Sequence, residues 1–225
     1  MLSWFTRTAN SSIGKKALMS LTGLLLIGFL VAHLAGNFTF YADSDGEAFN
    51  AYAEKLESLG LVLTIAEVGL LALFVIHMGL AFALNRRSKE ARSAEYRMRA
   101  GKGRATAASK SMLITGLIIG VFLVVHVSDF RIKKLVGSPE VADLAVAVGD
   151  RLTSPVGLFV YLAGIIALGL HLRHAVQSAL QTLGLAHPRY ATAVRLASDG
   201  LAAAVTVGFA SIPLFLLFTG QGGAQ

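Results

Sequence analysis

Five stretches of this 225-residue chain are long and apolar enough to cross a membrane, and this feature limits the possible folds more than any other. Crossing the hydrocarbon core of a bilayer takes about 20 residues of α-helix. The stretches cover about 17–40, 60–84, 111–130, 155–183 and 196–218. Charged residues make up 15% of the chain, against about 25% in soluble domains. We therefore predict an all-α integral membrane protein, with one domain over residues 1–225 and five transmembrane helices.

The charges between the spans predict their orientation. Fifteen of the 20 lysine and arginine residues lie before the first span or in and beside the second and fourth connections, whereas the first connection is acidic. Because basic connections stay in the cytoplasm, the N-terminus is expected inside and the C-terminus outside. The same rule accounts for the net charge of +7 without a nucleic-acid partner. Apolar residues on one face of Pro139–Leu152 predict a short helix at the outer surface, and the uneven spacing of the spans gives no sign of an internal repeat.

Four of the six histidines lie inside four different spans: His33, His77, His126 and His171. A charged side chain at the centre of a bilayer costs about 2.5–3.5 kcal/mol on insertion scales, so ionisable residues there usually face the bundle interior and have a partner. The chain has no cysteine, which excludes disulfides, thiolate-held iron–sulfur clusters and covalent c-type haem. The histidines are therefore the strongest candidates for a functional site.

The histidines of the first and third spans lie at matching depths. His33 is 17 residues beyond Lys16, or about 26 Å from the inner boundary, and His126 is 16 residues beyond Lys110, or about 24 Å. Both positions fall in the outer leaflet. We therefore expect His33 and His126 to form an outer pair.

The histidines of the second and fourth spans lie towards the inner side. His77 is nine residues before Arg86, or about 14 Å from the inner end, and His171 is 16 residues beyond Pro155, or about 24 Å below the outer end. Neutral imidazole is a good iron ligand, so two pairs at two depths predict two bis-histidine haems. With both axial positions filled, each iron transfers electrons and does not bind oxygen.

Other interpretations of these histidines stay open at this point. Each histidine could hydrogen-bond across helices, or the set could line a proton or solute pathway. A pathway usually brings acids into the membrane, and Glu67 is the only acid well inside a span. We consider Glu67 either a structural hydrogen-bonding residue or a proton relay to a quinone, which makes it the candidate catalytic residue. A non-haem metal site needs histidines clustered at one depth, and the only His-x-x-His runs from His171 to His174.

The propionate groups of a haem need cationic side chains or hydrogen-bond donors beside them. The candidates are Arg86, Arg87 and Arg173 for the inner pair and Arg131 and Lys133 for the outer pair. Anchoring at the membrane interface explains each of these equally well. Small residues at Gly36 and Gly164 are expected to let a flat macrocycle approach the helices.

Four motifs carry further information. They are SIGKKALMSLTG at Ser12–Gly23, HLAGN at His33–Asn37, AFNAY at Ala48–Tyr52 and HLRHAVQSALQTLGL at His171–Leu185. Together they resemble the di-haem cytochrome b membrane subunit of succinate:quinone oxidoreductases, and the likeness runs over most of the chain. One departure is Ala175, where the family pattern has glycine.

The resemblance implies a cofactor arrangement. In that family a single five-helix chain binds two b-type haems, one above the other. His77 and His171 would hold the inner, proximal haem, and His33 and His126 the outer, distal haem. The first histidine of the last motif is the family's ligand, which favours His171 over His174.

The resemblance also implies a function. The chain would be the membrane anchor and electron-transfer subunit of succinate dehydrogenase or fumarate reductase, in the bacterial cytoplasmic membrane. Its partners would be a flavoprotein and an iron–sulfur subunit on the cytoplasmic face, and its substrate would be menaquinone or ubiquinone. The family's quinone-site residues do not map onto this chain, and no dicarboxylate site is expected in it. The alternatives are the cytochrome b subunit of another respiratory oxidoreductase, such as a hydrogenase or formate dehydrogenase, and a histidine-relay transporter.

Overall fold

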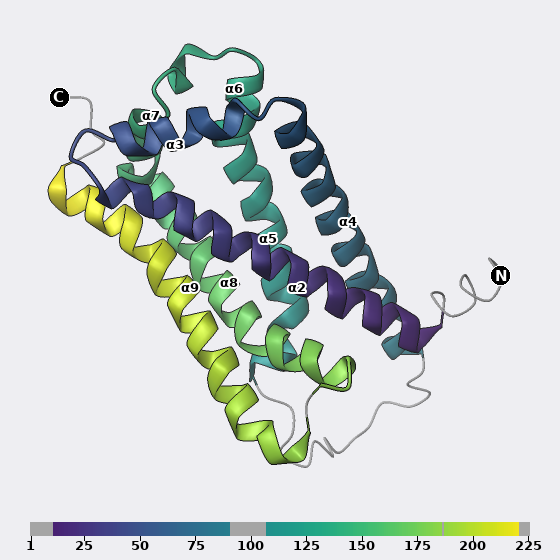
Figure 1. Cartoon of the computed structure of the whole chain (residues 1–225). Coiled ribbons are helices and arrows are strands. Elements are labelled where there is room, and N and C mark those ends of the chain that lie inside the picture. The colour runs from purple at the N-terminus through teal and green to yellow at the C-terminus, as the bar shows by residue number, and fades with distance from the viewer. Residues whose placement is uncertain (1–10, 91–106, 186, 221–225) are drawn as a thin grey trace.

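The computed structural model describes residues 11–90, 107–185 and 187–220, and the regular structure of these residues is entirely helical. Five helices are long and apolar enough to cross a membrane (Figure 1). They are α2 (Ser12–Asn37), α4 (Leu61–Glu90), α5 (Ala107–Val127), α8 (Pro155–Thr182) and α9 (Ala191–Thr219). The prediction of an all-α protein with five candidate transmembrane helices is thereby confirmed.

Several helices extend beyond the predicted spans. α2 begins at Ser12 rather than near residue 17, and α9 begins at Ala191 rather than near residue 196. Hydropathy marks the part of a helix that matches the hydrocarbon core, whereas backbone hydrogen bonds continue into the polar interface. At the start of α2 the Ser11 hydroxyl accepts from the Gly14 N–H at 3.0 Å and caps the helix. Residues 91–106, the larger part of the basic second connection, lie outside the described residues.

Short elements join the long helices. They are η1 (Phe38–Tyr41), α3 (Glu47–Glu57), the π-helical turn η2 (Ser128–Ile132), α6 (Lys133–Leu135), η3 (Pro139–Val141), α7 (Leu144–Thr153) and η4 (Pro188–Tyr190). The helix predicted at Pro139–Leu152 is present as η3 followed by α7. The helix α3 in the first connection was not predicted. Both α3 and α7 lie at the same end of the bundle (Figure 1).

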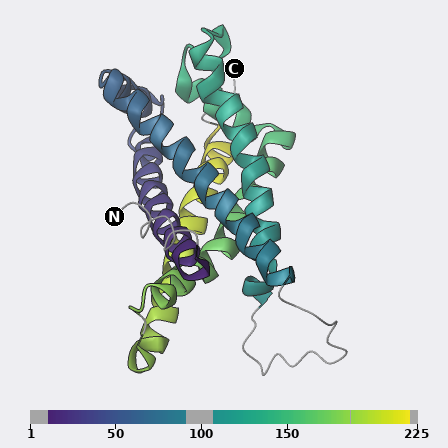
Figure 2. The same cartoon turned by 90° about the vertical axis from the view of Figure 1, so that its right-hand side faces the viewer.

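Among the long helices, α2 packs on α4, α8 and α9, and α8 packs on α5 and α9. α2 crosses in front of α8 and α5 in Figure 1, and α4 lies in front in Figure 2. The side chains of Phe74 and Met78 on α4 reach Gly120 on α5. Within the described residues no extensive packing joins α2 to α5, or α4 to α8. None of the apolar window of α4 is buried, compared with 33% in both α8 and α9. The helices that carry each predicted histidine pair therefore share no extensive packing in the described residues.

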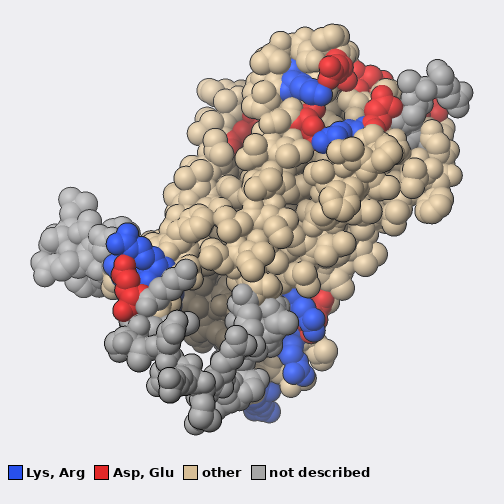
Figure 3. Space-filling model, turned by 180° about the vertical axis from the view of Figure 1, so that it is seen from behind, with Lys and Arg blue, Asp and Glu red and all other residues tan. Residues whose placement is uncertain are grey.

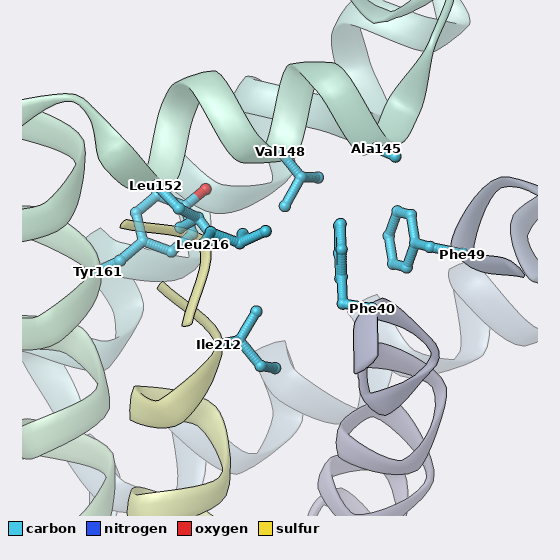
Figure 4. Packing of buried hydrophobic residues seen from close by; sticks show 8 residues of the cluster. All are labelled: Phe40, Phe49, Ala145, Val148, Leu152, Tyr161, Ile212 and Leu216. Atoms are coloured by element: carbon cyan, nitrogen blue, oxygen red, sulfur yellow. The ribbon is translucent and has the colours of Figure 1, made fainter. Parts of the chain in front are cut away.

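The main hydrophobic core lies at the end of the bundle that α3 and α7 cover (Figure 4). The rings of Phe40 and Phe49 stack there with their centroids 4.0 Å apart. Around them are Ala145, Val148, Leu152, Tyr161, Ile212 and Leu216. This core joins the short helices to α8 and α9, and Phe122 of α5 packs against it.

The AFNAY motif joins α3 to the rest of the molecule. The Asn50 side chain donates to Asp143 at 2.9 Å and accepts from the Ala145 N–H at 2.9 Å, which connects α3 to the start of α7. Tyr52 packs against Gly36, where a Cβ atom would collide with the tyrosine ring. Gly36 therefore makes room for this tyrosine, and not for a macrocycle as the sequence suggested.

The surface matches a protein that spans a membrane. On the face shown in Figure 3, charged side chains gather at the two ends and leave a band without charged side chains between them. Exposed apolar side chains on the long helices include Val68, Val121 and Val207, which are 62%, 68% and 67% exposed. Such a band is stable in lipid, so a multi-pass membrane protein is the natural interpretation.

Candidate cofactor site among the transmembrane helices

The four membrane histidines lie on four different long helices. His33 is on α2, His77 on α4, His126 on α5 and His171 on α8. The rings of His33 and His126 have their centroids 5.9 Å apart. For His77 and His171 no ring contact is present in the described residues, although a charge on His77 would act on His171. The structure thus brings the rings of His33 and His126 together, while the pairing of His77 with His171 stays a prediction.

The outer pair has the spacing of two ligands on one metal ion. Metal–imidazole bonds are about 2 Å long, so two imidazoles bound in line have ring centres about 6 Å apart. His33 and His126 are 5.9 Å apart, with ring planes at 77°. The Nδ1 atom of His126 is buried and has no hydrogen-bond partner in the described part of the chain. A buried polar atom that the protein leaves without a partner is typical of a site that binds another group.

Aromatic side chains surround the outer pair. Phe29 stacks on His33 with centroids 5.4 Å apart, and Phe122 stacks on His126 at 5.7 Å. Tyr161 lies edge-on to His126 at 5.8 Å. An apolar shell of this kind limits water and lowers the local dielectric constant, which tunes the redox potential of a bound metal.

A polar network lies at the outer edge of this shell. Asp129, in the π-helical turn η2, accepts hydrogen bonds from Arg151 at 2.7 Å and from the Tyr161 hydroxyl at 3.1 Å. Its carboxylate is close enough to act electrostatically on His126. π-Helical turns often occur at functional sites, because they shift side chains out of the regular helical positions. Neither Asp129 nor its partners Arg151 and Tyr161 were predicted as site residues from the sequence.

The inner pair is held by two buried threonines. His77 Nδ1 lies 3.1 Å from the Thr22 hydroxyl oxygen, and His171 Nδ1 lies 3.2 Å from that of Thr115. Both hydroxyls also bond to carbonyls one turn back in their own helices, to Leu18 at 2.9 Å for Thr22. A hydroxyl has one proton to donate, so the threonine oxygen accepts from the Nδ1–H of the imidazole. The backbone of Met19 is a further hydrogen-bond partner of His77, and that of Met112 is one of His171. With the Nδ1 proton donated to these oxygens, each Nε2 lone pair is available to a metal.

A glycine follows each of these threonines and faces the same ring. A Cβ atom at Gly23 would lie 3.3 Å from His77 Cε1, and one at Gly116 would lie 3.6 Å from His171 Cε1. The two inner histidines therefore pack directly on helix backbone. By contrast, the ring of Phe122 fills the space beside Gly164, where the sequence suggested room for a macrocycle.

The donor set fits a haem bound by two imidazoles at each level. All four side chains are imidazoles, and each pair bridges helices without extensive direct packing. Two Nε2 atoms are left free by threonine hydrogen bonds, and one outer nitrogen is buried without a partner. The described residues contain no group of three or more His, Cys, Asp or Glu side chains suited to a metal ion, which argues against a clustered non-haem site within them.

Glu67 is bound to Arg131. Arg131 Nη2 donates to Glu67 Oε2 at 2.8 Å, and its Nε lies 2.8 Å from the other carboxylate oxygen. The pair links α4 to η2 beside an open pocket of about 410 Å³, which Thr64 and Lys134 help to line. Glu67 therefore has the partner that a structural role requires, and a carboxylate in this place is also reachable from the outer surface.

The proposed propionate partners have partners within the protein. Arg86 pairs with Glu90, Arg173 with Asp199, and Lys133 with Glu140, while Arg87 donates to the Ser12 hydroxyl. With the Glu67–Arg131 pair, every one of the five cations has a neighbour of its own. His174, one turn beyond His171, lies close enough to act electrostatically on His171, as His77 does.

Sequence reasoning missed Thr22 and Thr115, although a signal was present. The pair Thr-Gly stands 11 residues before the histidine in both the first and the third span, from 22 to 33 and from 115 to 126. A threonine in an apolar helix usually bonds to its own backbone, so neither residue drew attention.

Comparison of the chain with protein-family models, with curated proteins and with solved structures found no match. Its function is therefore argued from the sequence motifs and the geometry of the site.

Proposed function

We propose that this chain is the di-haem cytochrome b membrane subunit of a succinate:quinone oxidoreductase. The observation that carries the proposal is the sorting of four membrane histidines into two pairs, each across helices that are not direct neighbours. The motif resemblance supplies the identity of the enzyme, and the geometry supports the cofactor arrangement. Two bis-histidine haems would supply a pair of one-electron carriers between an iron–sulfur partner and a quinone in the membrane.

The residues of this chain would have distinct roles. His77 and His171 present Nε2 atoms at the inner level, because Thr22 and Thr115 hold their Nδ1–H groups. His33 and His126 provide the outer level inside an aromatic shell that keeps water away. The four imidazoles would thus be neutral ligands in apolar surroundings, which avoids the free-energy cost of burying charged side chains.

The orientation proposed is N-terminus inside and C-terminus outside, in a bacterial cytoplasmic membrane. The inner pair then lies towards the cytoplasmic face, where Lys15, Lys16, Arg86 and Arg87 gather at the ends of α2 and α4. A flavoprotein and an iron–sulfur subunit would dock on that face, and the basic side chains would attract acidic surfaces of the partner.

The test of the haem assignment is spectroscopic. Purified protein should show a b-type reduced-minus-oxidised spectrum and, in a pyridine haemochrome assay, two haems per chain. His77→Ala and His171→Ala should each leave one haem, the outer one, while His174→Ala should keep both. A protein without b-type haem, or with clearly one haem in the wild type, contradicts the proposal.

The test of the enzyme assignment uses the assembled complex. A complex isolated through a tag on this chain should contain a flavoprotein and an iron–sulfur subunit, and succinate should reduce its haems. Haems that respond to hydrogen or formate but not to succinate would assign the chain to another respiratory oxidoreductase. Proton or solute flux without any haem would favour the transporter alternative.

A further inference from the structure

We propose that Thr22 and Thr115 are positioning residues that hold His77 and His171 in the orientation and tautomer needed to bind the inner haem. The inference rests on the proposed function and names residues that the motif resemblance does not assign. Neither threonine would touch the iron. Each would act through the histidine with which it forms a hydrogen bond.

Burial is the first argument for this role. Thr22 is 7% exposed and Thr115 is 4% exposed, and both are among the few buried polar side chains of the described residues. Their hydroxyls lie 3.1 and 3.2 Å from the Nδ1 atoms of His77 and His171. In an apolar bundle an imidazole N–H without a partner is costly, so this hydrogen bond, together with the backbone of Met19 beside His77 and of Met112 beside His171, favours one ring orientation and one tautomer.

The second argument is that the arrangement occurs twice. Thr22 and Gly23 contact the histidine of α4, and Thr115 and Gly116 contact the histidine of α8 in the same way. The hydroxyl of Thr115 bonds to the carbonyls of its own preceding turn, as does that of Thr22. The same threonine–histidine contact is thus present between α2 and α4 and between α5 and α8.

The repeat extends to the outer pair. Phe29 stacks on His33 four residues later, and Phe122 stacks on His126 four residues later. Position 22 corresponds to 115, 29 to 122 and 33 to 126, so the two members of each corresponding pair are 93 residues apart in the sequence. This correspondence corrects the expectation from the sequence that the chain has no internal repeat. Each helix pair would supply one ligand to each haem, together with one threonine for the inner haem.

The hydrogen bond has a chemical consequence that can be measured. An imidazole that donates its Nδ1–H to an oxygen is a more basic ligand at Nε2. A more basic ligand stabilises ferric over ferrous iron and lowers the midpoint potential. Removal of the hydroxyl should therefore raise the midpoint potential of the inner haem and leave that of the outer haem unchanged.

The experiment compares isosteric and conservative variants of the holoprotein. Thr22→Val and Thr115→Val remove the hydroxyl and keep the shape, whereas Thr22→Ser and Thr115→Ser keep the hydroxyl. Thr206→Val is the matched control, because Thr206 on α9 bonds to the Ala202 carbonyl at 2.7 Å and has no histidine partner. Each protein is titrated by spectroelectrochemistry, with low-spin ferric signals followed by electron paramagnetic resonance. The inner haem is identified as the signal lost in His77→Ala.

The expected result is a rise in the inner haem potential and altered ferric signals in both valine variants, with values near the wild type in the serine variants and in Thr206→Val. Binding of the inner haem should weaken by about 10-fold or more in the valine variants. Valine variants whose inner haem keeps the wild-type potential and signals overturn the inference, as does a shift confined to the outer haem. Because two sites are tested, a fold defect in one variant leaves the other to decide. A wild type without two haems contradicts the proposed function itself, which is a different outcome.

Discussion

The ring centroids of His33 and His126 are 5.9 Å apart, although α2 and α5, which carry these histidines, share no extensive packing within the described residues. Direct helix packing therefore does not explain why the two rings meet. The proposed outer haem would need about this separation, because an ion between two imidazoles holds their ring centres about 6 Å apart.

Loss of either outer histidine should have the same effect. We expect His33→Ala and His126→Ala to remove the outer haem and leave the inner one, because each variant deprives the same iron of one ligand. The pyridine haemochrome assay should give one haem per chain for both. Thr39→Val is the control, since the Thr39 hydroxyl donates to the Gly36 carbonyl at 2.8 Å, and it should keep two haems. Different haems lost from His33→Ala and His126→Ala would refute the pairing.

The packing of Gly164 predicts a long-range effect on the outer site. A Cβ atom at Gly164 would lie 2.5 Å from the ring of Phe122, which stacks on His126. Gly164→Ala should therefore displace Phe122, cost about 1–3 kcal/mol in stability and alter the spectrum of the outer haem alone. Gly200→Ala on α9 has nothing within 4 Å of the added atom and should leave both spectra unchanged. Thermal unfolding in detergent and difference spectra measure the two effects, and an unaltered outer spectrum in Gly164→Ala would contradict the prediction.

The spans and the histidine pairs could be predicted because they depend on one helix at a time. A continuous apolar run marks each span, and a fixed rise per residue gives the depth of each histidine. The order of the helices could not be predicted in the same way. Apolar helices in lipid have no hydrophobic preference for one neighbour over another, so the contacts of Thr22 with His77 depend on close packing that hydropathy does not record.

The short elements at the end of the bundle that α3 and α7 cover were predicted only in part, because they depend on distant partners. Apolar periodicity gave the helix near Pro139–Leu152. The helix α3 is short and mixes polar with apolar residues, and it is held by Phe49 in the core and by Asn50 on the start of α7. The turn η2 depends on ion pairs of Asp129 and Arg131 with two different helices. Such contacts join residues far apart in the chain, so a local sequence pattern does not predict them.

The ion pair of Glu67 and Arg131 separates the two roles considered for Glu67. If the pair is structural, Glu67→Gln and Arg131→Gln should destabilise the protein equally, with a coupling energy of about 1 kcal/mol in a double-mutant cycle. Quinone reduction by the folded variants should then be unaffected. The Lys133–Glu140 pair is the control, because its side chains are 43% and 67% exposed, against 31% and 35%, and its coupling should be smaller. Slow quinone reduction in Glu67→Gln, but not in Arg131→Gln, would instead support a proton relay.

The contact between Asn50 and Asp143 predicts a dependence of stability on pH. The Asn50 side-chain hydrogen bond, with help from the Val146 N–H, lowers the pKa of Asp143 below its ordinary value of 3.8. An acid whose pKa is lowered on folding stabilises the folded state above its unfolded pKa, and this contribution is lost as the pH falls through the folded pKa. We therefore expect a coupling of less than about 1 kcal/mol between Asn50→Ala and Asp143→Asn at neutral pH, since Asp143 is exposed. The coupling should shrink below pH 3.8, where thermal unfolding of the double-mutant cycle in detergent measures it. A coupling that stays constant from neutral to acid pH would show that the charge of Asp143 does not contribute to the link between α3 and α7.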